Sequence, residues 1–210
     1  MKKLYINQYA PNPRKPILLM QAKGLDIYNL DDLQIIEVDF AKDEQSTDEF
    51  ARINPLKLVP VLTLEDGTII NDSQAICEYL DKTYGQTSLM GQGAVHRAKV
   101  CAMRRAAELE VLYPYMLAFQ HGHPSKAHRV EQVAEFVPKS IKRAVDALPY
   151  FEAILKDHDY LVDNALSFAD IVLYLALDFG RVHKVKPTEQ SDGVARFYSR
   201  MNEKFGMKKP

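Results

Sequence analysis

Residues 58–73 read LVPVLTLEDGTIINDS, and this stretch decides the fold class. Two short runs of valine, leucine, isoleucine and threonine in it are separated by Asp66-Gly67, a dipeptide that favours a tight hairpin turn. A helical pattern follows over 72–85, beginning with an aspartate and a serine that suit the first turn and ending at a glycine. The stretch therefore predicts an antiparallel strand pair that leads into a helix.

The residues before this stretch alternate strand-like and helix-like patterns. Asn12 suits the N-cap of a predicted helix, Pro13 its first position and Gly24 its C-terminal stop. In chain order, the strands and helices predicted for this half are 3–6, 13–23, 33–38, 47–53, 61–64, 68–70 and 72–85. This order, β-α-β-α-β-β-α, requires a right-handed crossover between the first two strands. We therefore expect an α/β domain whose first two strands are parallel and whose last two are antiparallel.

The second half of the chain is predicted to be all helical. A capping box, Ser167-x-x-Asp170, precedes the apolar segment 171–179, which we expect at the centre of this half. Residues 86–93 contain two glycines and no periodicity, so they are predicted to be a linker. The other predicted helices are 94–121, interrupted at most by Pro114; one or two over 126–156, with kinks or breaks at Pro138 and Pro149; and 194–205.

Composition excludes several classes of protein. The chain has 210 residues, of which 47% are hydrophobic and 26% charged, as is usual for globular proteins, and no apolar run is long enough to span a membrane. Two cysteines and no Cys-x-x-Cys motif exclude a disulfide framework and dithiol redox chemistry. A net charge of −1 argues against non-specific nucleic-acid binding. No secretory signal is recognised, so we expect a cytoplasmic protein.

The charge distribution indicates two domains. Residues 1–84 carry 9 basic and 14 acidic side chains, whereas residues 85–210 carry 18 and 14. The net charge therefore changes sign near residue 85, where the α/β pattern gives way to the all-helical one.

Val59-Pro60 is the first candidate binding element. A proline that opens a strand after a β-branched residue is a candidate for a cis peptide bond, which would turn the amide and carbonyl of Val59 outward. Main-chain groups of that kind can pair with an extended peptide as an added strand. The alternative is an ordinary trans proline at the start of a strand.

The helix start at Asp72-Ser73 is the second candidate. Unpaired amides and the positive end of the helix dipole make a helix N-terminus suitable for a carboxylate, and Ser73 adds a hydroxyl donor. Asp72 could receive an ammonium group, so the two residues together suit the amino-acid end of a zwitterion. The alternative is that Asp72 only caps its helix.

The loop over residues 7–12 is the third candidate, because it leads into a helix N-terminus, where a thiolate would be stabilised. The Asn12 side chain could donate a hydrogen bond to such a sulfur or could serve only as the N-cap. Tyr5 and Tyr9 are phenolic alternatives, which could equally be a strand-face residue and a loop residue.

Taken together, these features resemble the cytosolic glutathione S-transferases over essentially the whole chain. The segments that carry the resemblance are Asn54-Pro55 with residues 58–62, Asp72–Ile76, the capping box, and residues 10–15 followed by 22–24. The resemblance implies a thioredoxin-like glutathione-binding domain over 1–84, a linker over 85–93, and an all-α domain over 94–210. It also implies a homodimer that takes glutathione as co-substrate and needs no metal.

The resemblance implies roles for particular residues. Val59, next to Pro60, would pair its main chain with the cysteinyl part of glutathione, while Ser73 would hold the γ-glutamyl carboxylate and Asp72 the γ-glutamyl amine. Two positions depart from the family pattern. Leu58 stands where many members have a lysine for the glycyl carboxylate, which leaves Lys57 as the nearby cation. Ala10 stands where serine-type members carry the catalytic hydroxyl, so Asn12 is favoured for the sulfur, with Tyr5 as the alternative.

The implied activity is that of a glutathione transferase, in which the thiolate attacks a small electrophile, with peroxidase or disulfide-reductase side activity. The alternative is a non-catalytic member that binds a ligand or a partner. The electrophile would contact the first long helix of the second half, between the domains. Candidate contacts there are Tyr113, Tyr115, Met116 and Phe119, which could equally be core residues.

Overall fold

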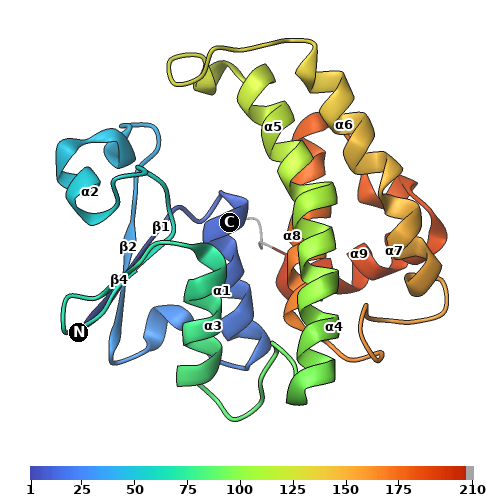
Figure 1. The fold of residues 1–210 in the computed structure, drawn as a ribbon, viewed down its shortest axis with the longest axis horizontal. Coiled ribbons are helices and arrows are strands. Elements are labelled where there is room, and N and C mark those ends of the chain that lie inside the picture. The colour runs from blue at the N-terminus through green and yellow to red at the C-terminus, as the bar shows by residue number, and fades with distance from the viewer. Residues whose placement is uncertain (207–210) are drawn as a thin grey trace. The chain divides into compact units, whose positions relative to one another are not determined.

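The computed structural model describes residues 1–206, which form two compact units, Met1–Ser88 and the part of the chain from Leu89 onward. The first unit is built around a four-stranded sheet and the second is helical (Figure 1). The predicted fold class, a thioredoxin-like βαβαββα domain followed by a helical domain, is confirmed.

The sheet of the first unit has the strand order β2-β1-β3-β4. Its strands are β1 (Lys2–Ile6), β2 (Leu33–Glu37), β3 (Val61–Thr63) and β4 (Ile69–Ile70). β1 and β2 are parallel and β3 and β4 are antiparallel, as predicted, and β3 is also antiparallel to β1. The hairpin turn has Gly67 at φ +87°, and the Asp66 carboxylate accepts the amide of Thr68. Tight hairpin turns require such a positive φ, which glycine adopts readily, and this is why Asp-Gly predicts a hairpin.

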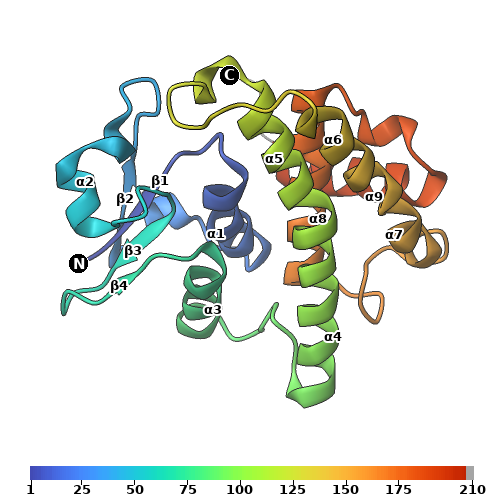
Figure 2. The same ribbon diagram turned by 45° about the horizontal axis from the view of Figure 1, so that its top comes forward.

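Helices cover both faces of the sheet (Figure 2). α1 (Pro11–Ala22) packs against α3 (Ser73–Thr83) on one face, where alternate strand residues such as Leu4, Ile6 and Leu62 are fully buried. On the other face lies α2 (Asp48–Ile53), whose buried Phe50 belongs to a cluster with Val38 and Val61. Successive residues of a strand point to opposite faces, so one short strand supplies both cores.

The start of α1 differs from the prediction. The helix begins at Pro11, its N-cap is Ala10, and Asn12 is its second residue rather than its N-cap. Proline is well suited to the first position of a helix because the N–H that it lacks would have no partner there. The prediction gave that position to Pro13, but Pro11 holds it.

The second unit contains six α-helices within the described residues. They are α4 (Gly93–Ala106), α5 (Tyr113–Gly122), α6 (Phe136–Asp146), α7 (Leu148–Leu155), α8 (Phe168–Gly180) and α9 (Asp192–Phe205). A π-helical segment, Ala107–Leu112, joins α4 to α5 without a break. Pro114, in the first turn of α5, has no N–H and cannot donate the usual helical hydrogen bond to the carbonyl of residue 110. The wider π turns just before it fit a position where this hydrogen bond is absent.

The helices predicted over 126–156 are shorter than expected. Pro138 and Pro149 lie in the first turns of α6 and α7, so these prolines mark helix starts rather than kinks, and residues 127–135 are not helical. The capping box of Ser167 and Asp170 is present as predicted, and α8 behind it is buried almost all round.

Candidate functional site

Three segments of the first unit meet at one edge of the sheet. β1 and β3 are antiparallel, with Tyr5 opposite Val61, so the residues that follow β1 lie beside those that precede β3. In the hairpin, Leu62 is opposite Ile70, so the end of β4 lies beside the start of β3. The residues between β4 and α3 therefore lie at the same edge. The candidate site consists of these segments: the β1–α1 loop with the first turn of α1, the residues before β3, and the first turn of α3.

The main chain of Val59 can pair with a ligand. The Val59–Pro60 peptide bond is cis. β3 begins only at Val61, and none of the hydrogen bonds recorded for residues 1–206 involves the amide or carbonyl of Val59. The Val59 side chain packs in the cluster beneath α2 and thereby anchors the residue. The arrangement presents one free donor and one free acceptor at the sheet edge, as an added strand requires.

Asn54 holds the segment before β3 in shape. It is fully buried, and its side-chain amide donates to the carbonyl of Leu58 over 2.8 Å while its Oδ1 accepts the amide of Leu56 over 3.1 Å. Asn71, immediately before the α3 cap, also donates to Asn54 Oδ1, at 3.4 Å. Asn54 thus connects two of the three segments of the site. The sequence contributed the Asn-Pro motif but gave Asn54 no role, because its partners are main-chain groups that no spacing rule identifies.

The first turn of α3 combines a cap with an anion site. Asp72 is the N-cap, and its Oδ1 accepts the amides of both Gln74 and Ala75 at 2.9 Å. The capping alternative is therefore present in the structure, yet it engages only one carboxylate oxygen, so Asp72 can also receive a cation. Because these two amides are taken, Ser73 offers the remaining donors of the turn, its own amide and its hydroxyl.

Lys15 brings a positive charge to the same place. Its side chain is 1% exposed, and its Nζ lies 3.4 Å from the hydroxyl oxygen of Ser73, which joins α1 to α3. The sequence analysis missed this residue. The available signal was its place on the predicted helix, because Lys15 shares a face with Leu18 and Leu19, which are both buried. A lysine on an apolar face, next to a helix N-terminus, is suited to binding a carboxylate.

The first turn of α1 has Asn12 at its second position, between two prolines. The N-cap, Ala10, has no side-chain hydrogen bond, and Pro11 and Pro13 have no N–H. Asn12 therefore supplies the only main-chain amide among the first three helical positions, and its half-buried side chain adds a second donor. Asn7 shapes the loop that precedes it, donating to the carbonyl of Val38 and accepting the amide of Tyr9.

The other first-unit candidates lie in different surroundings. The ring of Tyr5 packs edge-on against Phe50, with centroids 6.1 Å apart, so this tyrosine belongs to the cluster beneath α2. Tyr9 is 70% exposed. Lys57 adopts a left-handed backbone, at φ +56°, and its Nζ donates to the carbonyl of Ser46 over 2.7 Å. Leu58 is exposed. These contacts place Tyr5 in the core of the first unit, whereas Tyr9 and Leu58 lie at its surface.

Three of the four electrophile candidates on the second unit are at least partly accessible. Tyr113 is half exposed, and Met116 and Phe119 are partly buried. Tyr115 differs, because it is 1% exposed, stacks on His183 and fills the space above Gly180, where an added Cβ would lie 2.9 Å from its ring. Burial raises the pKa of the Tyr115 phenol to about 12. The structure therefore places Tyr115 in the core of its unit, which was the alternative for this residue.

No group of three or more histidine, cysteine, aspartate or glutamate side chains in residues 1–206 is arranged to hold a metal ion. None of the helices over the same residues is long and apolar enough to cross a bilayer.

Comparison with known proteins matches both halves of the chain to one family. Residues 9–83 match the family model of the N-terminal domain of glutathione S-transferase, and residues 105–204 match that of its C-terminal domain. Glutathione S-transferase 2 of Saccharomyces cerevisiae is 29% identical over 208 residues, which cover 98% of this chain and 88% of the relative.

A solved structure has the same fold, and a further relative is similar in sequence. The crystal structure of Gtt2 from Saccharomyces cerevisiae superposes with a TM-score of 0.86 at 28% identity, over 96% of each chain. Probable elongation factor 1-gamma 1 of Arabidopsis thaliana is 28% identical over 170 residues, which cover 78% of this chain and 40% of that protein. Relatives of this chain thus include a protein that is not named as a transferase.

Proposed function

Because the chain belongs to the glutathione S-transferase family, we propose that it binds glutathione at the candidate site and ionises its thiol for attack on a small electrophile. The observation that carries this proposal is the meeting of two features at one sheet edge. One is the unpaired main chain of Val59, and the other is the Ser73 hydroxyl at the start of α3 with the Lys15 ammonium 3.4 Å from it. A short peptide with an amino-acid end fits both.

Each part of glutathione has a partner in this arrangement. The cysteinyl residue pairs with the amide and carbonyl of Val59, and the γ-glutamyl carboxylate binds Ser73 with the Lys15 ammonium beside it. The γ-glutamyl amine faces the carboxylate oxygen of Asp72 that the cap leaves open. The glycyl carboxylate pairs with Lys57, the basic residue nearest to Val59 in the sequence, whose Nζ also donates to the carbonyl of Ser46. The sulfur then lies next to the first turn of α1.

Neutral donors are sufficient to ionise the thiol. A free thiol has a pKa of about 8.5, so only a few per cent of it is thiolate at pH 7. A hydrogen bond to a charged group contributes about 1.5–3 kcal/mol, and each pKa unit corresponds to 1.36 kcal/mol, so the Asn12 side chain lowers the thiol pKa by about one to two units. The dipole of α1 adds about 0.3–1 kcal/mol. No general base is needed.

Retention on glutathione-agarose combined with turnover of a chlorodinitrobenzene substrate tests the proposed function. We expect both retention and turnover. Retention without turnover favours the non-catalytic alternative, for which Ala10 is the specific observation, because its methyl group cannot donate to sulfur. A protein that is not retained on the resin, and that glutathione does not protect against thermal unfolding, contradicts the proposal.

Lys15→Met is expected to raise the KM for glutathione about 10- to 100-fold while changing kcat little. Losing one charge-assisted contact costs about 1.5–3 kcal/mol, and the γ-glutamyl carboxylate is distant from the reacting sulfur. Steady-state kinetics with glutathione and with cysteinylglycine, which lacks the γ-glutamyl group, separate this role from a general loss of structure. The variant should lose much of its preference for glutathione, whereas the exposed control Lys3→Met should keep it. An unchanged preference in Lys15→Met would remove Lys15 from the site.

A further inference from the structure

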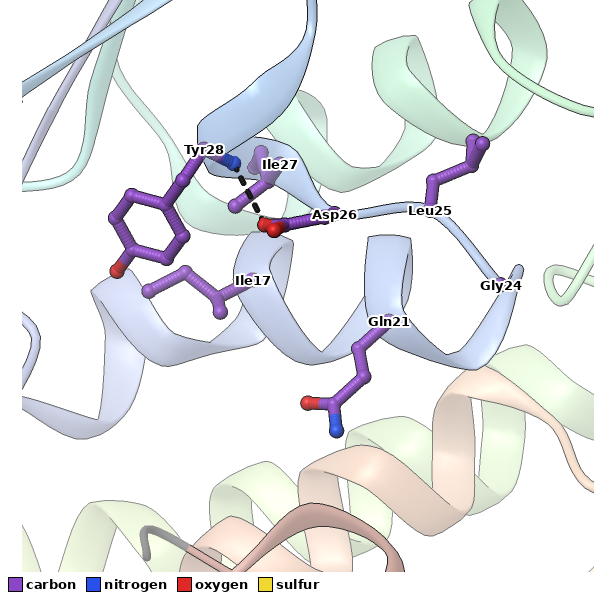
Figure 3. A pocket seen from close by; sticks show the side chains of 7 residues that line it. All are labelled: Ile17, Gln21, Gly24, Leu25, Asp26, Ile27 and Tyr28. Atoms are coloured by element: carbon purple, nitrogen blue, oxygen red, sulfur yellow. Dashed lines mark hydrogen bonds between the residues drawn. The ribbon is translucent and has the colours of Figure 1, made fainter.

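A cavity of about 420 Å³ lies in the first unit, away from the candidate site (Figure 3). It is formed by the second half of α1, the chain reversal that follows it, and the single 3₁₀ turn Ile27–Asn29. Asn12 and Gln21 are separated by about 14 Å along the helix axis, so the cavity and the first turn of α1 are distinct places. The volume lies within the range of small-molecule sites.

The cavity has apolar walls. Ile17 comes from α1, Leu25 from the chain reversal, and Ile27, which is 2% exposed, from the 3₁₀ turn. Tyr28 is about half exposed and closes one side with its ring (Figure 3). Such walls suit a compact hydrocarbon or aromatic group, because burying its surface is favourable by about 25 cal/mol per Å².

The one charged side chain among the seven lining residues is acidic. The Asp26 carboxylate lies next to the main-chain amide of Tyr28, from which it accepts a hydrogen bond (Figure 3). Burial raises the pKa of the Tyr28 phenol, and the nearby carboxylates of Glu37 and Asp26 raise it further. None of the seven lining residues is basic, since the set is Ile17, Gln21, Gly24, Leu25, Asp26, Ile27 and Tyr28.

The nearest basic residue in the sequence is committed elsewhere. Lys23, the C-cap of α1, donates to the carboxylate of Asp81 over 2.9 Å and to the carbonyl of Thr87 over 2.6 Å, and its side chain is 3% exposed. It therefore does not neutralise Asp26. The C-terminal end of α1, which carries the negative end of the helix dipole, lies beside the cavity as well.

We propose that this cavity binds a small organic cation, an ammonium group carried on an aromatic or short aliphatic body. The ammonium pairs with the Asp26 carboxylate. The body packs on Ile17 and Leu25, with the ring of Tyr28 in position for a cation–π contact. Asp26 already accepts the amide of Tyr28 at 3.0 Å and the side-chain amide of Asn29 at 2.6 Å, one on each oxygen. Each carboxylate oxygen accepts a second bond, so these contacts orient the group without exhausting it.

The test compares three probes of similar shape and different charge: 2-phenylethylamine, 2-phenylethanol and 3-phenylpropionate. Titration into the full-length protein, followed by amide chemical shifts, is expected to show binding of the cation with shifts centred on residues 17–28. The alcohol should bind at least about tenfold more weakly, and the anion should not bind. Equal binding of the three probes, or shifts centred elsewhere, overturns the proposal.

The variant Asp26→Asn isolates the charge. Asparagine still accepts the amide of Tyr28 as a cap, and the variant loses only the bond from the exposed Asn29 side chain to the second oxygen. Affinity for 2-phenylethylamine should fall about tenfold, and the matched control Asp31→Asn, an exposed acid outside the lining, should change it less than twofold. Unaltered affinity in Asp26→Asn overturns the proposal. Glutathione retention should be unaffected in both variants, so this site and the proposed glutathione site fail or succeed separately.

Discussion

Asn12→Ala should raise the pKa of the bound glutathione thiol by about one to two units and lower kcat/KM at neutral pH by about 10- to 100-fold. The side-chain amide is one hydrogen bond to a charged sulfur, and that bond accounts for about 1.5–3 kcal/mol. The helix itself should be unharmed, because alanine has a higher helix propensity than asparagine. Ultraviolet absorption of the thiolate as a function of pH measures the pKa directly, and turnover of a chlorodinitrobenzene substrate measures the rate.

Tyr5→Phe is the matched control for Asn12→Ala. The Tyr5 ring packs against Phe50, and phenylalanine preserves that contact, so the thiol pKa should not change in this variant. The opposite result, an unchanged thiol pKa in Asn12→Ala and a raised one in Tyr5→Phe, would move the role to Tyr5. No change in either variant would assign it to the main-chain amide of Asn12.

Asp170→Asn is expected to lower the free energy of unfolding by about 3 kcal/mol or more. The Asp170 carboxylate is fully buried and accepts the amides of Leu161 and Ser167 and the hydroxyl of Ser167, each at 2.8 Å. The side chain of asparagine has an NH2 group in place of one carboxylate oxygen. This group faces at least one of these donors and cannot accept its hydrogen bond, so a buried donor is left unpaired. Urea denaturation followed by circular dichroism measures the loss.

The pH dependence of that loss has a definite sign. Burial raises the pKa of the Asp170 carboxyl to about 6, in opposition to the hydrogen bonds from Leu161 and Ser167, which favour the charged form. The folded protein therefore binds a proton more tightly at this residue than the unfolded chain does, and the contribution of Asp170 grows as pH falls. The stability difference between wild type and Asp170→Asn should increase by about 1 kcal/mol from pH 7 to pH 5. A difference that shrinks over this range would contradict the raised pKa.

Local signals in the sequence predicted much of the fold. The Asp66-Gly67 turn and the Ser167–Asp170 capping box depend on residues within a few positions of one another, and both are present as predicted. The predicted start of α1 was wrong because Asn12 suits an N-cap and Pro13 a first position, whereas Pro11, two residues earlier, suits the first position equally well and holds it. The break expected near Pro149 is present between α6 and α7, but the helical start expected at residue 126 was wrong, because Pro138 lies in the first turn of α6 and not within a helix that begins earlier.

The candidate site was predictable where main-chain geometry follows from sequence order. Val59, Asp72 and Ser73 lie at strand and helix ends, and the strand order brings those ends to one edge. Asn54 and Lys15 could not be assigned in that way, because their roles depend on contacts with Leu58 and Ser73 across the fold. The hydrophobic periodicity of a helix can indicate that a polar residue is buried, but it does not identify the residue with which that side chain forms a hydrogen bond.

The measurement that tests the account most directly is the pH titration of the glutathione thiol in complex with the unmodified protein. The account expects an apparent thiol pKa about one to two units below the value of the free thiol, near 8.5. A bound thiol that titrates at its free value would show that the sulfur does not lie against the first turn of α1, and would contradict the central claim.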